Sequence, residues 1–488
     1  MTGWRSVVER VDARIGDGLE SVLCRHHTRR LRRLGWGHVL AREPIVGDRG
    51  FADGPPVRDG NQVRVLIDGE QALPAMAEAI SRATTSVHIA GWHASPDFRL
   101  VREPGAPTLR ERLADVAERV PVRMLLWAGP PVPLFQPTRR AAKKACDSFA
   151  DGTKVRCVLD SRERTMHCHH EKLVIVDGTV AFVGGIDFTA LEGDRHDSGA
   201  HQPDRDLGWH DVATELRGPV VADVAAHFAA RWSELTDERL PEPAVPPAAG
   251  TSTVQLVRTV PERTYRFLPR GEFTILDAYL RALRSAESLV YLENQFLWSP
   301  EIAEVLIDKL RRPPTDRFRL VLLLPRRPSN GADTTKGQLG RLLDADGDAG
   351  RLLATTIQAH DGARSALVYV HAKVGIVDDR WMTVGSANLN EHSLFNDTEV
   401  NIVTDDAELI RDTRLRLWSE HLQAPRAELD AVADPTDIVD TRWRRIAEEQ
   451  SQRERDGLPR THRLTFLPDV SRRAERLGGP LRGLLVDG

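Results

Sequence analysis

The sequence predicts an α/β protein made of two similar halves. Three observations lead to this prediction. Short apolar runs alternate with stretches of helical spacing, a proline- and alanine-rich segment interrupts the alternation near residue 240, and one motif occurs twice. Strands that alternate with helices are typical of layered α/β domains. The chain has 488 residues, which is too many for one ordinary core, so two domains or more are expected.

The alternation begins at residue 63. Residues 63–67, 86–92 and 122–127 have the apolar, β-branched character of strands, and helical spacing lies between them at 73–83 and 109–120. After the linker-like segment 240–250, helices are expected at 274–285 and 300–310, and strands at 289–292 and 319–324. We therefore predict a first domain at 63–238, a linker at 239–252 and a second domain at 253–424.

Two further segments flank these domains. Residues 1–62 form an expected N-terminal arm, in which apolar residues from Trp4 to Leu23 recur at helical spacing and precede several arginines, Arg25, Arg29, Arg30, Arg32 and Arg33. Such a helix either lies on an anionic membrane surface or packs on its own domain. Gly16 and Gly18 weaken the helix and favour packing. Residues 425–488 are charged and are expected to form a C-terminal extension with a peripheral helix and a poorly determined tail.

The composition is that of a globular protein, with 41% hydrophobic and 28% charged residues. A net charge of −4 gives no overall basic footprint, so a nucleic-acid partner is not expected. Four cysteines are too few for a disulfide framework in a chain of this length. The first residues lack the apolar core of a signal peptide, and no run of about 18 apolar residues occurs. We expect a cytoplasmic protein that contacts the membrane surface transiently.

The repeated motif relates the two halves by a constant shift. His371 and Lys373 stand 201 positions after His170 and Lys172 (371 less 170, and 373 less 172), and Asp378 stands 201 after Asp177. The shift persists without a gap to residues 184–187 (GGID) and 385–388 (GSAN). In both copies the pattern predicts a strand, a tight turn and a return strand, at 173–183 and at 374–384. A chance origin is far less plausible for two such copies than for one.

The residue types in the motif suit chemistry on a phosphate. Residues two apart in a strand face the same side, so each histidine would project beside its lysine. If the two hairpins meet, Lys172 and Lys373 would neutralise the charge of a phosphate in the transition state. One histidine could then attack phosphorus, while the other protonates the leaving alcohol. An orienting carboxylate is expected for each imidazole, and Asp211 and Glu399 are the candidates.

These residues resemble the paired HKD signatures of the phospholipase D superfamily. Further segments resemble that family in the family's order, over roughly residues 63–424: 184–187 (GGID), 209–212 (WHDV), 291–296 (YLENQF), 385–390 (GSANLN) and 397–399 (DTE). The resemblance implies two similar α-β-α sandwich domains, each a mixed sheet flanked by helices, related by a pseudo-two-fold axis with the active site at their interface. It also implies a phosphohistidine intermediate without a metal or cofactor.

The resemblance further implies roles for single residues. His170 would attack phosphorus, and His371 would act as general acid and then as base. Asp211 and Glu399 would orient these histidines in either pairing. Asp177 and Asp378 would brace the catalytic motif. The substrate phosphate is assigned to Gly185, Ser386 and Asn388, with Asp187 ranked lower. Asp187 replaces the asparagine of many family members, and we expect it to face away because a second carboxylate would repel phosphate.

The predicted function is a phospholipase D of the phosphatidylcholine phosphatidohydrolase type. It would act as a monomer on glycerophospholipids, with water or an alcohol as acceptor. The alternatives are a cardiolipin synthase-like phosphatidyltransferase, a nuclease of the same superfamily and a catalytically inactive lipid-binding module. A zinc site at residues 167–170 (HCHH) is disfavoured, because adjacent residues of a strand alternate faces.

Overall fold

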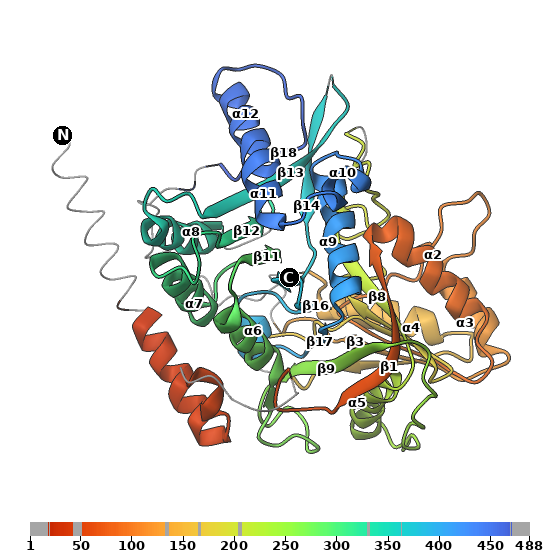
Figure 1. The fold of residues 1–488 in the computed structure, drawn as a ribbon. Helices are drawn as coiled ribbons and strands as arrows, with labels where there is room; N and C mark the ends of the chain where they lie inside the picture. The colour runs from red at the N-terminus through yellow and green to blue at the C-terminus, as the bar shows by residue number, and fades with distance from the viewer. Residues whose placement is uncertain are drawn as a thin grey trace.

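The computed structural model describes residues 20–41, 51–131, 136–163, 167–203, 207–328, 332–362 and 364–468, together with residues 18 and 470. Strands and helices alternate along most of this length (Figure 1). The α/β fold class predicted from the sequence is confirmed. The expected helical positions from Trp4 to Ile15 and the expected tail beyond residue 470 lie outside the described residues.

The first half is a mixed sheet with the strand order β4-β3-β2-β5-β6-β8-β1. β2, β3 and β4 run parallel, and the other neighbours are antiparallel. Its elements are β1 (Val57–Ile67), α2 (Asp68–Ser81), β2 (Val87–Gly91), α3 (Leu109–Ala117), β3 (Val122–Trp127), α4 (Arg139–Ala150), β4 (Arg156–Asp160), β5 (Leu173–Val176), β6 (Val180–Gly184), β7 (Gly208–His210), β8 (Val212–Arg217) and α5 (Val220–Leu235).

The second half has the order β13-β12-β11-β15-β16-β17-β9, with β11, β12 and β13 parallel. Its elements are β9 (Ser252–Val260), β10 (Glu272–Phe273), α6 (Thr274–Ser285), β11 (Leu289–Glu293), α7 (Pro300–Arg311), β12 (Arg319–Leu323), α8 (Ala332–Asp346), β13 (Leu352–His360), β14 (Ser365–Val370), β15 (Val374–Val377), β16 (Trp381–Gly385), the π-helical turn η2 (His392–Asn396), β17 (Glu399–Thr404) and α9 (Ala407–His421).

The two sheets therefore share one strand order, strand for strand. In the motif hairpins Leu173 pairs with Val183 and Val374 with Val384, so both pairs are related by the shift of 201 positions seen in the sequence (374 less 173, and 384 less 183). The sheets are joined through β1, whose first part pairs with β9 and whose second part pairs with β8. A short parallel pair, β7 with β14, also connects the halves.

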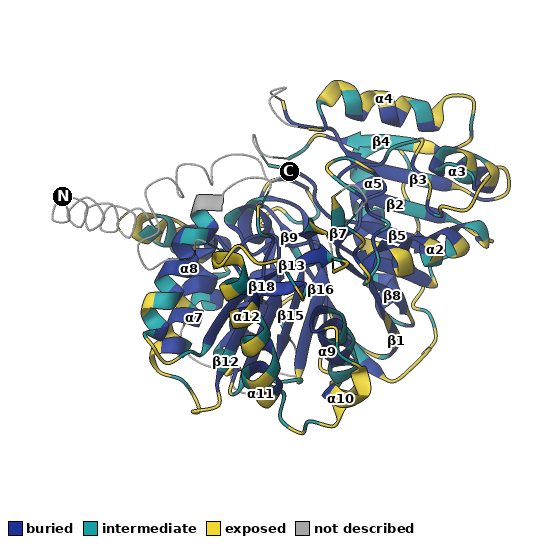
Figure 2. Ribbon diagram, turned by 90° about the horizontal axis from the view of Figure 1, so that it is seen from above, coloured by how far each residue is buried: buried dark blue, intermediate teal, exposed yellow. Residues whose placement is uncertain are grey.

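Helices cover both faces of each sheet, because alternate strand residues are apolar on both sides. In β2, Val87 and Ile89 pack in one core with α2, α3 and α4, and Ala90 packs in another with α5. In β11, Val290 faces α6 and α7, whereas Tyr291 faces α9. Figure 2 shows the strands almost wholly buried, while helices such as α4 and α12 expose their outer sides.

The described part of the N-terminal arm packs on the second half. Residues 20–34 are helical and precede the short helix η1 (Gly37–Leu40). Leu31 is fully buried in the core that contains α6 and α7. Arg30 is also buried, and its Nη2 lies 2.7 Å from Glu262 Oε2. Packing, which the sequence favoured, is thus what this segment shows, and Arg30 does not face a membrane surface.

The C-terminal extension is better integrated than the sequence suggested. It contains α10 (Arg426–Asp430), α11 (Pro435–Ile438), η3 (Val439–Trp443), α12 (Arg444–Arg455) and β18 (Leu464–Phe466). Trp443 is fully buried, with its ring centroid 5.4 Å from that of Trp418, and β18 pairs with β13. The expected peripheral helix is α12, in which only Ala447 and Gln450 are buried, whereas the anchoring of η3 and β18 was not expected. The few apolar residues that anchor this region are hidden among charged ones, and they cover the second sheet.

Among the described residues, no helix combines the length and the apolar character needed to cross a membrane.

Candidate active site

The two motif histidines lie where the sheets meet. Each stands just before the first strand of its hairpin, His170 before β5 and His371 before β15. The opposite half holds each one by its backbone. Thr398 O accepts hydrogen bonds from the N–H groups of His170 (2.9 Å) and Glu171, and His210 O accepts them from His371 (2.8 Å) and Ala372. Both histidines are therefore positioned by a carbonyl that directly precedes a carboxylate residue.

Those carboxylates orient the imidazoles crosswise. His170 Nδ1 lies 3.0 Å from Glu399 Oε1, and His371 Nδ1 lies 2.6 Å from Asp211 Oδ2. Each pair thus joins a histidine of one half to a carboxylate of the other. The sequence left the pairing open, because it depends on how the halves dock. With Nδ1 engaged by a carboxylate, Nε2 of each imidazole is the nitrogen left for chemistry.

Burial shapes the protonation of this site. It lowers the pKa of His371 well below its ordinary value, and the charges of Lys373, Arg195 and Lys172 lower it further, in that order. Burial also raises the pKa of Asp211 to about 6, although Lys373, the Val212 N–H and Arg195 oppose this. At neutral pH the resting pair is therefore a neutral imidazole that donates its Nδ1–H to an ionised carboxylate.

The two lysines have similar backbone contacts and different side-chain partners. Lys172 Nζ donates to His170 O over 2.7 Å, and Lys373 Nζ donates to His371 O. Lys172 Nζ also lies 3.0 Å from Asp187 Oδ2. Lys373 Nζ lies 3.2 Å from Gln295 Oε1, an uncharged amide. Both lysines are buried, so their charges act in a medium where water screens them weakly.

The residues assigned to the phosphate make protein contacts in the structure. A Cβ on Gly185 would lie 2.1 Å from Asp211 Oδ1, so this glycine makes room for the carboxylate. The Ser386 hydroxyl donates to Glu399 Oε2, and Asn388 Nδ2 lies 3.2 Å from Gln295 Oε1. Asp187 does not face away as expected. It is drawn inward by Lys172 and by the His93 N–H, 3.3 Å from its Oδ1.

The motif aspartates lie at the turn end of each hairpin. Asp177 accepts hydrogen bonds from the backbone N–H groups of residues 84–86, just before β2. Asp378 accepts them from residues 287–289, at the start of β11. Both aspartates adopt positive φ, 56° and 52°. They tie the hairpin to the neighbouring strand, the bracing role that the resemblance implied, and they are separated from the histidines by the length of β5 and β15.

Three residues of the site were missed by sequence reasoning. Ser393, in the turn η2, donates its hydroxyl to Glu399 Oε1. Trp209 packs on His371, with ring centroids 4.3 Å apart. Arg195 is buried with its guanidinium carbon 3.0 Å from the centroid of the Trp209 ring. Trp209 stood in a segment that resembles the family, but Arg195 and Ser393 lie in irregular polar stretches without a periodic signal.

The histidines next to His170 turn to different partners, as expected for neighbours in an extended chain. His167 Nδ1 lies 3.1 Å from His392 Nδ1, and His169 Nε2 lies 3.1 Å from Asp160 Oδ1. The four residues 167–170 therefore do not converge on one point, and a zinc site formed by them alone does not fit this geometry.

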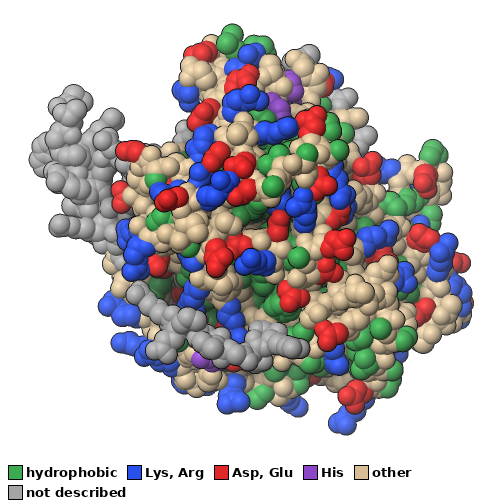
Figure 3. All heavy atoms as spheres, in the orientation of Figure 1, with side chains coloured by type: hydrophobic (Ala, Val, Ile, Leu, Met, Phe, Trp, Pro, Cys, Tyr) green, Lys and Arg blue, Asp and Glu red, His purple; other side chains and the backbone are tan. Residues whose placement is uncertain are grey.

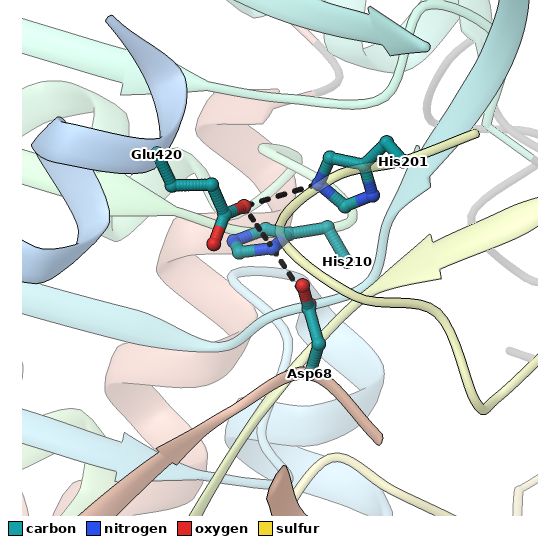
Figure 4. A group of neighbouring side chains, drawn as sticks. All are labelled: Asp68, His201, His210 and Glu420. Atoms are coloured by element: carbon teal, nitrogen blue, oxygen red, sulfur yellow. Dashed lines mark hydrogen bonds and ion pairs between the residues drawn. The ribbon is translucent and has the colours of Figure 1, made fainter. Parts of the chain in front are cut away.

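A buried histidine–carboxylate network lies next to Asp211, and Figure 4 shows four of its residues, Asp68, His201, His210 and Glu420. His210 Nδ1 lies 2.9 Å from Asp68 Oδ1 and its Nε2 lies 3.0 Å from Glu293 Oε2. His201 Nε2 lies 3.0 Å from Glu420 Oε1. Asp68 Oδ1 also accepts the Asp211 N–H over 3.1 Å. Because these residues come from both halves, the network fixes the backbone that carries Asp211 against the backbone that carries His371.

The chain is similar in sequence to known phospholipase D proteins. A family model described as "Cardiolipin synthase, PLD-like domain" matches residues 279–419. Phospholipase D A of Dictyostelium discoideum is 27% identical over an alignment that covers 75% of this chain and 36% of that protein. Phospholipase D2 of Bos taurus is 26% identical, with 72% of this chain and 50% of that protein covered. The predicted resemblance to the phospholipase D superfamily is thereby confirmed.

A solved structure shares the fold. The phosphatidylserine synthase of Haemophilus influenzae aligns with a TM-score of 0.54 over 80% of this chain and 94% of that chain, at 11% identity. At this identity the match concerns the fold alone. The chain spans only 36% and 50% of the length of the two phospholipase D relatives.

Proposed function

We propose that this protein is a phosphodiesterase of the phospholipase D type, which transfers the phosphatidyl group of a glycerophospholipid to water or an alcohol. The observation that carries the proposal is the crossed arrangement of His170–Glu399 and His371–Asp211 beside Lys172 and Lys373. The two imidazoles and the two buried lysines are close enough for Lys373, Lys172 and His170 all to lower the pKa of His371, and such a cluster suits an in-line attack on a phosphodiester.

In the first step His170 Nε2 attacks phosphorus. A P–N bond forms while the bond from phosphorus to the headgroup oxygen breaks, and His371 gives that oxygen a proton. Glu399 stabilises the positive charge that develops on His170, because it accepts the Nδ1–H. Lys172 and Lys373 offset the negative charge of the phosphoryl oxygens. The products are the headgroup alcohol and a phosphatidyl-histidine.

In the second step water or an alcohol attacks the same phosphorus. His371 Nε2 accepts its proton, the new P–O bond forms, and the P–N bond to His170 breaks. His371 is neutral in the resting site, so it must gain a proton before the first step. The anionic phosphodiester supplies the reason for this gain, since a negative charge beside an imidazole raises its pKa.

The mechanism is tested with phosphatidylcholine vesicles and ethanol. The wild type should release choline and form phosphatidate together with phosphatidylethanol. His170→Ala should abolish both products, because the nucleophile is lost. Unchanged turnover by a folded His170→Ala protein would contradict the mechanism.

A matched control is available at His169, the neighbour of the nucleophile. Its side chain faces Asp160 and Thr398 rather than His371. His169→Gln should keep the chemistry, although it disturbs a buried contact. Comparing the two variants at equal folded fraction separates loss of the nucleophile from general damage to this segment.

A phosphatidyltransferase of the cardiolipin synthase kind is the second candidate, because the family model that matches residues 279–419 carries that description. The same phosphatidyl-histidine would then be captured by the hydroxyl of a second phosphatidylglycerol. Vesicles of phosphatidylglycerol alone distinguish the two functions: cardiolipin and glycerol indicate the transferase, whereas phosphatidate and glycerol indicate hydrolysis.

The proposed substrate lies in a membrane, and contact with its surface is expected to be transient. The face shown in Figure 3 carries acidic and basic side chains intermixed rather than one broad basic area. This favours a lipid over a nucleic-acid backbone on that face. Hydrolysis of single-stranded DNA without turnover of any phospholipid would overturn the proposed substrate class.

A further inference from the structure

Arg195 is a buried cation that the mechanism above does not use. Only 4% of the residue is exposed, and its Nε and Nη1 have no hydrogen-bond partner among the described residues. Leaving a buried hydrogen-bond donor without an acceptor costs about 1–3 kcal/mol, and more for a charged group. An arginine with a purely structural role is normally satisfied by carbonyls or carboxylates. Its two open donors therefore require an explanation.

The packing holds this guanidinium close to the reacting groups. Its carbon lies 3.0 Å from the centroid of the Trp209 ring, and that ring lies 4.3 Å from the ring of His371. The backbone of Arg195 is also held, because a Cβ on Gly69 would lie 1.6 Å from Arg195 O. A side chain stacked on an indole and anchored in this way has little freedom to leave.

Electrostatic interactions link Arg195 to the carboxylates and the histidine of the candidate active site. Burial lowers the pKa of Arg195 to about 10, and the carboxylates of Asp187 and Asp211 are the strongest charges opposing that shift. Arg195 also lowers the pKa of His371 more than Lys172 does. Its charge therefore acts on both members of the His371–Asp211 pair.

The charges of the first half explain why an additional cation is useful there. Lys172 lies 3.0 Å from Asp187 Oδ2, so a carboxylate offsets much of its charge. The corresponding residue of the second half is Asn388, an uncharged amide. A phosphodiester that enters the site therefore meets a Lys–Asp pair on one side. Arg195, on which Asp187 is the strongest acting charge, is a cation available to offset that carboxylate.

We propose that Arg195 is a third cation of the phosphate site, whose guanidinium donates along one edge, from Nη2–H together with either Nε–H or Nη1–H, to non-bridging oxygens of the substrate phosphate and compensates Asp187. A guanidinium is suited to this task, since its donors form a planar fork that matches two phosphate oxygens. The inference rests on the proposed function for the identity of the substrate. The binding of a phosphate group, however, does not require turnover.

Binding of inorganic phosphate to the full chain, measured by calorimetry at neutral pH, tests the proposal independently of catalysis. Arg195→Gln should weaken phosphate binding about tenfold or more, because one charge-assisted pair of hydrogen bonds is lost. Arg195→Lys keeps the charge without the fork and should fall between Arg195→Gln and the wild type. Arg82→Gln, at an arginine whose side chain is 78% exposed, should bind as the wild type does.

The double variant Asp187→Asn with Arg195→Gln tests the compensation. Removing the carboxylate together with the guanidinium should recover most of the affinity lost in Arg195→Gln, a result that a merely structural role would not produce. If Arg195→Gln does not fold, Arg195→Lys and Asp187→Asn decide: the first should bind phosphate more weakly than the wild type and the second more tightly.

Three outcomes would overturn the proposal. The first is a folded Arg195→Gln protein with wild-type affinity for phosphate, the second is a double variant no better than Arg195→Gln, and the third is a wild type that binds no phosphate. Failure of the proposed function would look different. The chain would then bind phosphate through Arg195 and still turn over no phospholipid.

Discussion

The two halves of the candidate active site share one backbone arrangement and differ in charge. In both, a histidine precedes the first strand of a hairpin, a carbonyl of the opposite half binds its N–H, and a carboxylate of that half binds its Nδ1. Around the lysines the halves diverge. The first has Asp187 beside Lys172 and Arg195 above Trp209, whereas the second has the amides Asn388 and Gln295 near Lys373.

This difference suggests which features a phosphodiester site must keep and which it can vary. The histidine–carboxylate pairs set atom positions, and a small change in their geometry affects every step. The residues around Lys172 and Lys373 determine only the net charge next to the phosphate, and different residues can give the same net charge. In the proposed mechanism the same backbone arrangement carries two histidines with different roles, one as nucleophile and one as acid and base.

The largest effects are expected from the carboxylates that orient the histidines. Glu399→Gln and Asp211→Asn should each lower turnover of phosphatidylcholine by up to about 10⁴-fold, because the imidazole loses its orientation and its partner charge. A phosphatidyl ester of p-nitrophenol separates the two roles, since p-nitrophenolate leaves without a proton. Asp211→Asn should then release one equivalent of p-nitrophenol in a burst and stall, whereas Glu399→Gln should show no burst.

The reverse result, a burst only with Glu399→Gln, would mean that His371 is the nucleophile. The pH profile gives an independent check. Because burial raises the pKa of Asp211 to about 6, wild-type activity should decline below that pH as the carboxyl takes up a proton. The decline should be absent from the residual activity of Asp211→Asn.

A smaller effect is expected when the second half is given the charge of the first. Asn388→Asp places a carboxylate at the position that matches Asp187, close to Gln295 and Lys373. The second half has no counterpart of Arg195 among the residues described around Lys373, so kcat/KM should fall by roughly 10- to 100-fold through repulsion of the phosphate. Steady-state kinetics on phosphatidylcholine vesicles measure this. An Asn388→Asp enzyme as active as the wild type would show that local charge balance is unimportant.

The local structure around each motif could be predicted from the sequence, but the way in which the two halves pack together could not. The hairpins were predictable, because a strand, a tight turn and a return strand are encoded locally at 173–183 and at 374–384. The crossed pairing of His170 with Glu399 was not, since it requires the relative position of two sheets. Asp187 was expected to avoid the phosphate site, and the lysine that reverses this expectation lies 15 residues before it in sequence (187 less 172).

The role of Arg195 and the packing of the C-terminal extension could not be predicted for a different reason. Arg195 lies among glycine, aspartate and histidine residues with no period, and only its burial over Trp209 reveals it. Trp443 lies in a charged stretch that reads as exposed, although it packs against Trp418 and Tyr291. In both cases the deciding contact is made with a distant residue, whose position local pattern does not contain.

Because of the histidine–carboxylate network next to Asp211, the free energy of unfolding should fall as the pH becomes alkaline. The partners Asp197 and Glu420 outweigh the effect of burial and raise the pKa of His201 to about 9. The stabilisation that protonated His201 adds to the free energy of unfolding is therefore fully present below the unfolded-state pKa of about 6.5, and it is lost as pH rises through 9. Denaturant unfolding at a series of pH values should show a loss on the order of 3 kcal/mol across this window. His201→Gln should flatten that slope, whereas His360→Gln, at a half-buried site outside the network, should leave it unchanged.

The smallest effect on catalysis is expected from the two motif aspartates, where the halves are most alike. Asp177 and Asp378 each accept several backbone N–H groups at the turn end of a hairpin. Asp177→Asn and Asp378→Asn should each lower the free energy of unfolding by about 1–3 kcal/mol, because donors that lose their acceptor are left poorly satisfied. Turnover per folded molecule should change little in either variant. If one substitution abolished turnover in a folded protein and the other did not, the first aspartate would take part in the reaction itself. The two hairpins would then share a backbone structure but not a role.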